Sequence, residues 1–154
     1  MPTIARKVGS YIALAVAAIL TAFAVQSAQT MSQNERLVDD IVTNAPIGIV
    51  VCDKEGVIEA CNASFTVLVG DCRRLVGSKL TDLMPEEYRE RFDESRRTVV
   101  LQQQQNSLND KIVYTHTRPL LRCDGTTIDI VIHSVLAKRN GELKIFGFVT
   151  RKVE

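Results

Sequence analysis

Cysteine and histidine are the residue types that most often carry chemistry in a small domain, and this chain has four cysteines and two histidines. The cysteines are scattered, at Cys52, Cys61, Cys72 and Cys123. No two form the C-x-x-C pair typical of zinc or iron–sulfur ligation, so we expect no metal site. We interpret two or three of them as small buried hydrophobic residues. If the domain is exported, the alternative is a disulfide, which we expect between Cys52 and Cys61 on adjacent predicted strands.

The other reactive side chains occur without the spacing of a catalytic motif. We find no nucleophile–base pair, acidic dyad or phosphate-binding loop in the sequence. The strand pattern directs His133 away from the apolar side of its strand, which indicates a surface residue. We therefore expect no catalytic residues and no enzymatic activity.

Charge and length limit the partners of the C-terminal part. Residues 35–154 contain 17 Lys and Arg against 18 Asp and Glu, a net charge of −1. This balance gives no electrostatic basis for nucleic-acid binding. The length suffices for one domain with its own core.

The N-terminal part has no charge from Val8 to Asn34, and its apolar core is Val8–Val25. As an α-helix, these 18 residues would span about 27 Å, close to the hydrocarbon thickness of a bilayer. We consider three interpretations: a retained signal anchor, a signal peptide cleaved near Ala22-Phe23-Ala24, and a buried soluble helix. The length and the flanking Arg6 and Lys7 favour the anchor.

The basic flank also predicts the orientation. Arg6, Lys7 and the N-terminal amine favour a cytoplasmic N-terminus, so the C-terminal domain would lie outside the cytoplasm. We expect a single-pass membrane protein, or an exported soluble protein if the segment is cleaved. The predicted divisions of the chain are a tail with the transmembrane or signal segment at 1–31, an amphipathic helix at 32–44 and a domain at 45–154.

Apolar periodicity and turn residues predict the elements. Ser32 and Glu35 have the form of a capping box, and Leu37 and Ile41 lie on one face of the helix after it. Asn62 is expected to cap a helix start and Phe65 to enter the core. In chain order we then expect strands at 47–53 and 57–62, followed by short helices that end at Gly70, at Gly77 and before Pro85. A long helix should begin at Pro85, with Tyr88, Phe92 and Val99 on one face. Three more strands are expected at 112–122, 126–138 and 142–151.

With these elements in this order, the chain resembles the PAS domain family from about Leu37 to Lys152. The resemblance rests on the residues expected to form a hairpin turn and a helix cap in "APIGIVVCDKEGVIEACNASFTVLVG", on "LVGSKLTDLMP" and on the Asp-Gly and Asn-Gly hairpins. The pattern positions are Gly48, Asp53, Gly56, Ile58, Asn62 and Phe65. The resemblance implies an α+β fold with a five-stranded antiparallel sheet and short helices on one face, preceded here by a transmembrane helix.

The resemblance also bears on cofactors. Heme-binding members carry an axial histidine on the long helix, but Glu86–Leu108 contains none. In light-sensing flavin members a cysteine occupies the position that Leu80 holds here, so we do not assign a flavin adduct to the nearby Cys72. By resemblance we therefore expect neither heme nor a flavin adduct as cofactor, and the ligand is unknown.

The implied function is a membrane-anchored sensory or signalling module that binds a small ligand or a protein partner. The family's output-coupling motif would fall at Phe148-Val149-Thr150, and we recognise no output domain, so a signal would pass through the N-terminal helix or a partner. A ligand pocket would be lined by residues of the short helices, the long helix and the strand at 126–138: Phe65, Leu68, Leu75, Phe92, Ile130 and Ile132.

The alternative is a ligand-free dimerisation or interaction module, possibly exported. Both faces of the predicted sheet carry apolar side chains, and the second face needs a cover. We expect a homodimer in which the helix around Leu37 and Ile41 lies between two sheets. The surface predicted for a second copy or a signalling partner comprises Leu37, Ile41, Val131, Val135, Phe146 and Phe148.

Overall fold

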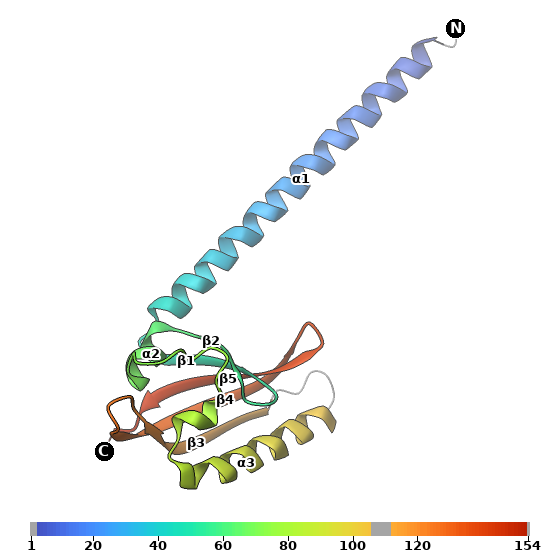
Figure 1. The fold of residues 1–154 in the computed structure, drawn as a ribbon. Helices are drawn as coiled ribbons and strands as arrows, with labels where there is room; N and C mark the ends of the chain where they lie inside the picture. Colours follow the sequence, from blue (N-terminus) through green and yellow to red (C-terminus); the bar gives the residue numbers. More distant parts are fainter. Residues whose placement is uncertain (1–2, 106–111, 154) are drawn as a thin grey trace. The chain divides into compact units, whose positions relative to one another are not determined.

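The computed structural model of the chain describes residues 3–105 and 112–153. It divides into two compact units, residues 1–41 and 42–154. The first consists of helix, and the second contains the sheet with its helices (Figure 1).

Helix α1, Thr3–Asn44, is continuous over 42 residues. The predicted helix at 32–44 is therefore helical, but its expected start at Ser32 is wrong. The helix passes through Ser32 because the alanine-rich residues before it are strong helix formers. Large apolar side chains from Leu14 to Val25 are exposed, Ile19 and Phe23 both at 68%. The side chains of residues 8–13, part of the predicted apolar core, lie outside the described part.

By length and composition, α1 contains a candidate membrane span within Leu14–Asn44. Three of its hydroxyl groups, those of Thr21, Ser27 and Thr30, are bonded within the helix. Thr21 donates to the carbonyl of Ala17 at 2.8 Å, and Ser27 donates to that of Phe23 at 2.9 Å. These polar groups therefore need no external hydrogen-bond partner, which suits an apolar environment.

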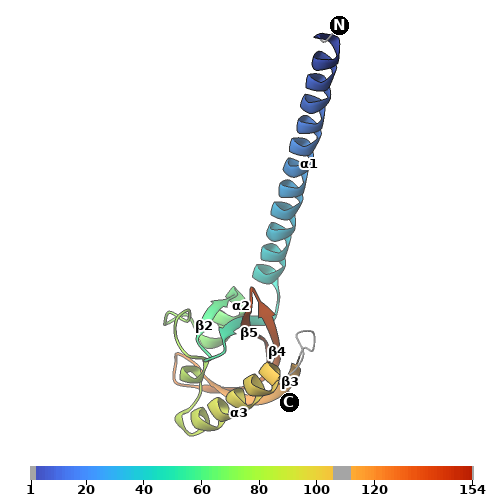
Figure 2. The ribbon, with the colours of Figure 1, turned by 90° about the vertical axis from the view of Figure 1, so that its right-hand side faces the viewer.

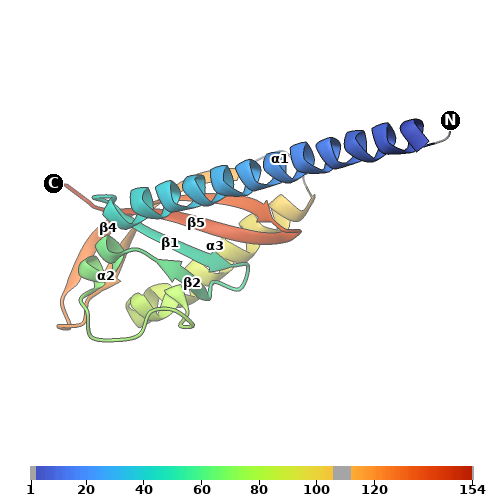
Figure 3. The same ribbon diagram turned by 90° about the horizontal axis from the view of Figure 1, so that it is seen from above.

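The second unit is built on a five-stranded antiparallel sheet in the order β2-β1-β5-β4-β3, which confirms the predicted fold class. The strands are β1 Gly48–Asp53, β2 Ile58–Cys61, β3 Ile112–Leu121, β4 Thr127–Arg139 and β5 Glu142–Arg151. The helices are α2 Ala63–Val69, the 3-10 helix η1 Leu80–Leu83 and α3 Glu86–Gln105. Figure 2 shows the curved sheet with α3 across its concave side, and Figure 3 shows α2 beside β1.

Strict alternation divides the two faces of the sheet. On β4, Ile130, Ile132, Ser134 and Leu136 are buried, whereas His133 between them is exposed, as its strand position predicted. Successive side chains of a strand point to opposite faces, so the buried set packs under the helices. The core comprises these residues with Phe65, Leu83, Met84 and their neighbours.

At the centre of the sheet, Gly147 lets two strands approach closely. Gly147 pairs with Val50 on β1 and with Ser134 on β4. A Cβ atom at this position would lie 2.9 Å from Cγ1 of Val50, closer than real Cβ contacts allow. The side chain of Val50 therefore occupies the space that any other residue at 147 would need.

Residues 72–77 do not form the short helix that the sequence predicted. The segment is irregular. Its end pairs with the edge of β2: Gly77 donates to the carbonyl of Ile58 at 2.8 Å, and Ile58 donates to that of Ser78 at 2.9 Å. These backbone groups bond to a strand, so they are not available to a helix. The long helix α3 is confirmed, although Tyr88 is 40% exposed and the buried residues are Val100 and Gln103.

Asn62 makes four side-chain hydrogen bonds to backbone groups in the second unit. Its Oδ1 accepts from the amides of Ile49 at 2.8 Å and Phe65 at 3.0 Å, the second being the predicted helix cap. Its Nδ2 donates to the carbonyls of Val42 at 3.0 Å and Ile47 at 2.9 Å. One buried amide thus joins the chain before β1, β1 itself and the start of α2.

We predict that Asn62→Ala lowers the free energy of unfolding by about 2–4 kcal/mol, because it leaves several backbone groups without partners. Ser64→Ala is the control, since Ser64 makes a single bond, from Oγ to the carbonyl of Ala45 at 2.6 Å. It should cost only about 1 kcal/mol. Urea unfolding followed by circular dichroism measures both. Equal losses for the two variants would contradict the role of Asn62.

Candidate functional site

Four polar residues meet at a small cavity under the sheet. Cys52 comes from β1, Arg96 from α3, Tyr114 from β3 and Ser134 from β4. The cavity measures about 20 Å³. Its other lining residues are Val50, Gly56, Leu80, Phe92, Ile132, Ile145 and Gly147.

Arg96 closes the cavity at the turn between β1 and β2. Its side chain is 10% exposed, forms an ion pair with Asp93 at 3.0 Å and donates from Nη1 to the carbonyl of Lys54. Its Nε is buried and has no hydrogen-bond partner. Gly56, at φ +83°, allows this approach, since a Cβ there would lie 3.0 Å from Nε. Arg96 therefore has one N–H donor available to an acceptor.

The remaining polar groups of the cavity are neutral. Burial, followed by the charge of Asp53, raises the pKa of the Cys52 thiol to about 12. Burial also raises the pKa of Tyr114, although the nearby side chain of Ser134 acts to lower it. Cys52 is therefore a protonated thiol at neutral pH and a poor nucleophile.

The volume of the cavity limits what it can hold. A cavity needs about 10–15 Å³ to hold one water molecule. The observed 20 Å³ is enough for one water and too small for a larger molecule without movement of a lining side chain. The core of the domain is thus nearly full.

The predicted pocket residues are only partly brought together. Phe92 and Ile132 line the cavity. Phe65, Leu75 and Ile130 are buried in the core, and Leu68 packs against it from a half-buried position. Their role in ligand binding stays a prediction.

Sequence patterns did not point to Arg96, Tyr114 or Ser134. Ser134 could have been found, because it is a polar residue at an inward position of β4 between Ile132 and Leu136. Tyr114 faces Ser134 across the β3–β4 pair. Arg96 carries no such signal, since a charged residue on a helix is usually a solvated one.

The outer face of the sheet carries a contiguous group of partly exposed apolar side chains. Phe146 lies between Val51 on β1 and Val135 on β4, and Phe148 lies beside Ile49 on β1. We call these residues, together with Val131, the outer face. On α1, the predicted surface residues Leu37 and Ile41 are 58% and 60% exposed.

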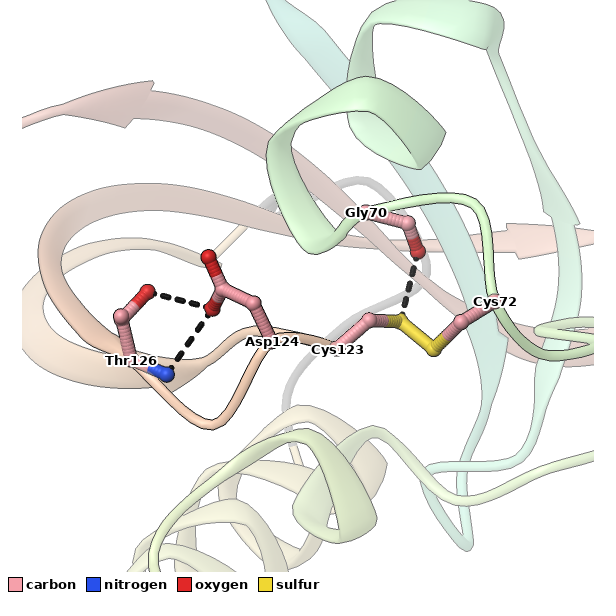
Figure 4. The surroundings of a disulfide bond; sticks show 5 residues. All are labelled: Gly70, Cys72, Cys123, Asp124 and Thr126. Carbon is pink, nitrogen blue, oxygen red and sulfur yellow. Dashed lines mark hydrogen bonds between the residues drawn. A yellow bond between two sulfur atoms is a disulfide. The ribbon is translucent and has the colours of Figure 1, made fainter.

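The cysteines pair differently from the prediction. A disulfide joins Cys72 to Cys123, whereas Cys52 and Cys61 are free (Figure 4). The expected Cys52–Cys61 bond is wrong because the register of the two strands places Ile58 opposite Cys52 and Val50 opposite Cys61. Within residues 3–105 and 112–153, no group of three or more His, Cys, Asp or Glu side chains could hold a metal ion.

The fold is similar to several solved PAS domains. A PAS domain of an HTR-like protein from Haloarcula marismortui has a TM-score of 0.63 at 18% identity, covering 82% of this chain and 98% of that one. One from a LuxR-family transcriptional regulator of Burkholderia thailandensis, in complex with ethanol, has a TM-score of 0.54 at 20% identity, with coverages of 73% and 95%. The PAS-B domain of Drosophila melanogaster Cycle with bound ethylene glycol has a TM-score of 0.54 at 15% identity, with coverages of 68% and 99%. No curated protein is significantly similar in sequence.

At the level of sequence, the family described as the PAS fold matches residues 42–136, which is more than half of the chain. The match begins just before β1 and ends within β4, so it includes α2, α3, the cavity residues up to Ser134, and Asn62. Together with the strand order and the helices on one face, this match shows that the chain belongs to the PAS family.

Proposed function

We propose that the chain is a membrane-tethered PAS signalling module that acts by self-association through the outer face and the helix around Leu37 and Ile41. The observation that carries this proposal is the contrast between the two faces of the sheet. The inner face encloses a cavity of only about 20 Å³, whereas the outer face leaves aromatic and branched side chains partly exposed. Contiguous exposed apolar groups of this kind mark interaction surfaces.

The partner we propose is a second copy of the chain. A tether in the same membrane raises the local concentration of identical domains. The outer face is apolar rather than charged, so it suits a partner surface of the same apolar character. Leu37 and Ile41 supply such a surface at i, i+4 spacing on α1.

The tether itself is α1. Apart from Thr21, its exposed residues from Leu14 to Val25 are apolar on all sides of the helix, and Thr21 and Ser27 bond to the helix's own carbonyls. We predict that the full chain stays in the pellet after carbonate extraction of membranes. Ile19→Arg should release a large fraction, because a charge at the centre of a span costs about 3 kcal/mol. Ser32→Arg, beyond the predicted apolar core, is the control and should stay in the pellet. Recovery of a wild-type species that starts near Val25 in the soluble fraction would instead show a cleaved signal peptide.

For self-association, we predict that a fragment of residues 32–154 forms a weak dimer. Ile41→Asp should weaken dimerisation at least tenfold, because an aspartate at a dry contact buries a charge. Ser32→Asp is the matched control, since its position lies on the opposite side of the helix. Val135→Asp tests the sheet side of the same contact. Sedimentation at two loading concentrations measures the effect. A monomeric wild type, or a dimer unaffected by both Ile41→Asp and Val135→Asp, would contradict the proposal.

A second candidate function is sensing of a very small polar molecule in the cavity. The unpartnered Nε of Arg96 favours it, since a buried donor needs an acceptor such as a hydroxyl or carbonyl oxygen. Two of the similar PAS domains are described with bound ethanol and ethylene glycol. Here, a molecule of that size requires Arg96 to move outward.

For this second function, we predict that millimolar ethylene glycol shifts the amide NMR signals of Cys52, Tyr114 and Ser134. Arg96→Met should abolish the shifts by removing the donor. Arg97→Met is the control, because Arg97 is exposed on the same helix and does not line the cavity. Unchanged spectra in the wild type, or equal shifts in both variants, would indicate that the cavity holds only water.

A further inference from the structure

The disulfide joins two loops that the fold already holds together. Cys72 comes after α2, and Cys123 opens the turn between β3 and β4, 51 residues further along the chain. Their Cα atoms are 5.8 Å apart, within the usual range for a disulfide. Figure 4 shows the bond beside Gly70, with the Cys123 sulfur 2.8 Å from the carbonyl oxygen of Gly70.

Backbone contacts next to the bond fix the position of Cys123. Its amide donates to the carbonyl of Val69, the last residue of α2, at 3.0 Å. A Cβ on Gly70 would lie 3.1 Å from the Cβ of Cys123, so the two segments are in close contact. Within the turn, Asp124 Oδ1 accepts from the amide of Thr126 at 2.9 Å and from its hydroxyl at 2.5 Å (Figure 4). The Cys123 side of the disulfide is therefore held in place by hydrogen bonds.

A second, independent observation concerns the N-terminal segment. Arg6 and Lys7 precede the apolar stretch, and the next charge is Glu35. In a retained anchor, this bias favours a cytoplasmic N-terminus, which would place the PAS domain on the other side of the membrane. A cleaved signal peptide would export the domain as well. The domain therefore lies on the same side of the membrane whether the segment is retained as an anchor or cleaved as a signal peptide.

From these two observations, we infer that the PAS domain works on the oxidising side of the membrane, where Cys72–Cys123 is a structural disulfide that fixes the loop between α2 and η1. Disulfides form and persist in such compartments and are rare in the cytosol. In forming the bond, the two thiols lose two electrons and two protons to the disulfide of a thiol oxidoreductase, which leaves as a dithiol.

The bond controls one end of the loop at residues 70–79. The other end is held by the pairing of Gly77 and Ser78 with Ile58. With the disulfide intact, both ends are fixed. After reduction, the end at Cys72 loses its covalent link, so the loop and the stability of the domain depend on the redox state of this one pair.

The test counts free thiols of the full chain in intact bacterial cells. Cells are quenched with acid, and the denatured protein is labelled with a maleimide-linked polyethylene glycol, with and without prior reduction. The wild type should show two free thiols before reduction, Cys52 and Cys61, and four after it. Cys72→Ser and Cys123→Ser should each show three in both conditions. Cys61→Ser, which leaves the bond intact, should show one before and three after.

A second measurement uses the purified full chain in detergent. Reduction should lower the Tm of the wild type and of Cys61→Ser by roughly 10 °C or more. It should leave the Tm of the Cys72→Ser/Cys123→Ser double variant unchanged. Each Tm is compared before and after reduction of the same protein, so the readout does not require either cysteine variant to reach wild-type stability.

Four free thiols in quenched wild-type cells would overturn the inference by showing a reduced domain. Two free thiols with peptide mapping to a bond other than Cys72–Cys123 would also overturn it. If mapping finds the Cys72–Cys123 bond but reduction leaves the Tm unchanged, the disulfide has no structural role. Because the thiol count does not depend on membrane retention or on dimerisation, its failure can be distinguished from failure of the proposed tether and dimer.

Discussion

The PAS domain depends on one buried side-chain amide. Asn62 satisfies the carbonyls of Val42 and Ile47 and the amides of Ile49 and Phe65 at the same time. These groups belong to the end of α1, the entry to β1, β1 itself and the first turn of α2. Buried backbone groups must find partners, so this single side chain links all four places. β2 and β5 pair directly with β1, and β4 and β3 then follow on the far side of β5.

Local signals predicted most of this architecture from the sequence. Asn140 and Gly141 adopt the positive φ angles, 52° and 80°, that an Asn-Gly hairpin turn requires. Gly70 ends α2 with φ 93°, and Asn62 caps its start. The period of two along β4 separated buried from exposed residues correctly. Each of these features depends on residues within a few positions of one another, which is why sequence patterns report them.

The features that the sequence did not predict depend on distant residues. The partner of Cys72 lies on the turn between β3 and β4, and no local pattern relates the two loops. The segment at 72–77 has helical composition, but pairing of Gly77 with Ile58 determines its conformation. Likewise, the inward position of Arg96 depends on the carbonyl of Lys54 and the space beside Gly56. At all three places, contacts between residues far apart in the sequence determine the structure, and at residues 72–77 they override the local helix propensity.

The close approach at Gly147 has a mechanical consequence. Gly147 lines the interior cavity and touches Val50, and its chain neighbours are Phe146 and Phe148 on the opposite face. Elsewhere in a core, a rotating side chain can absorb a small change in interior volume. At Gly147 there is no side chain to rotate, so a molecule pressing on this part of the cavity wall meets the backbone of β5 directly. Any displacement of the strand at that point would carry Phe146 and Phe148 on the outer face with it.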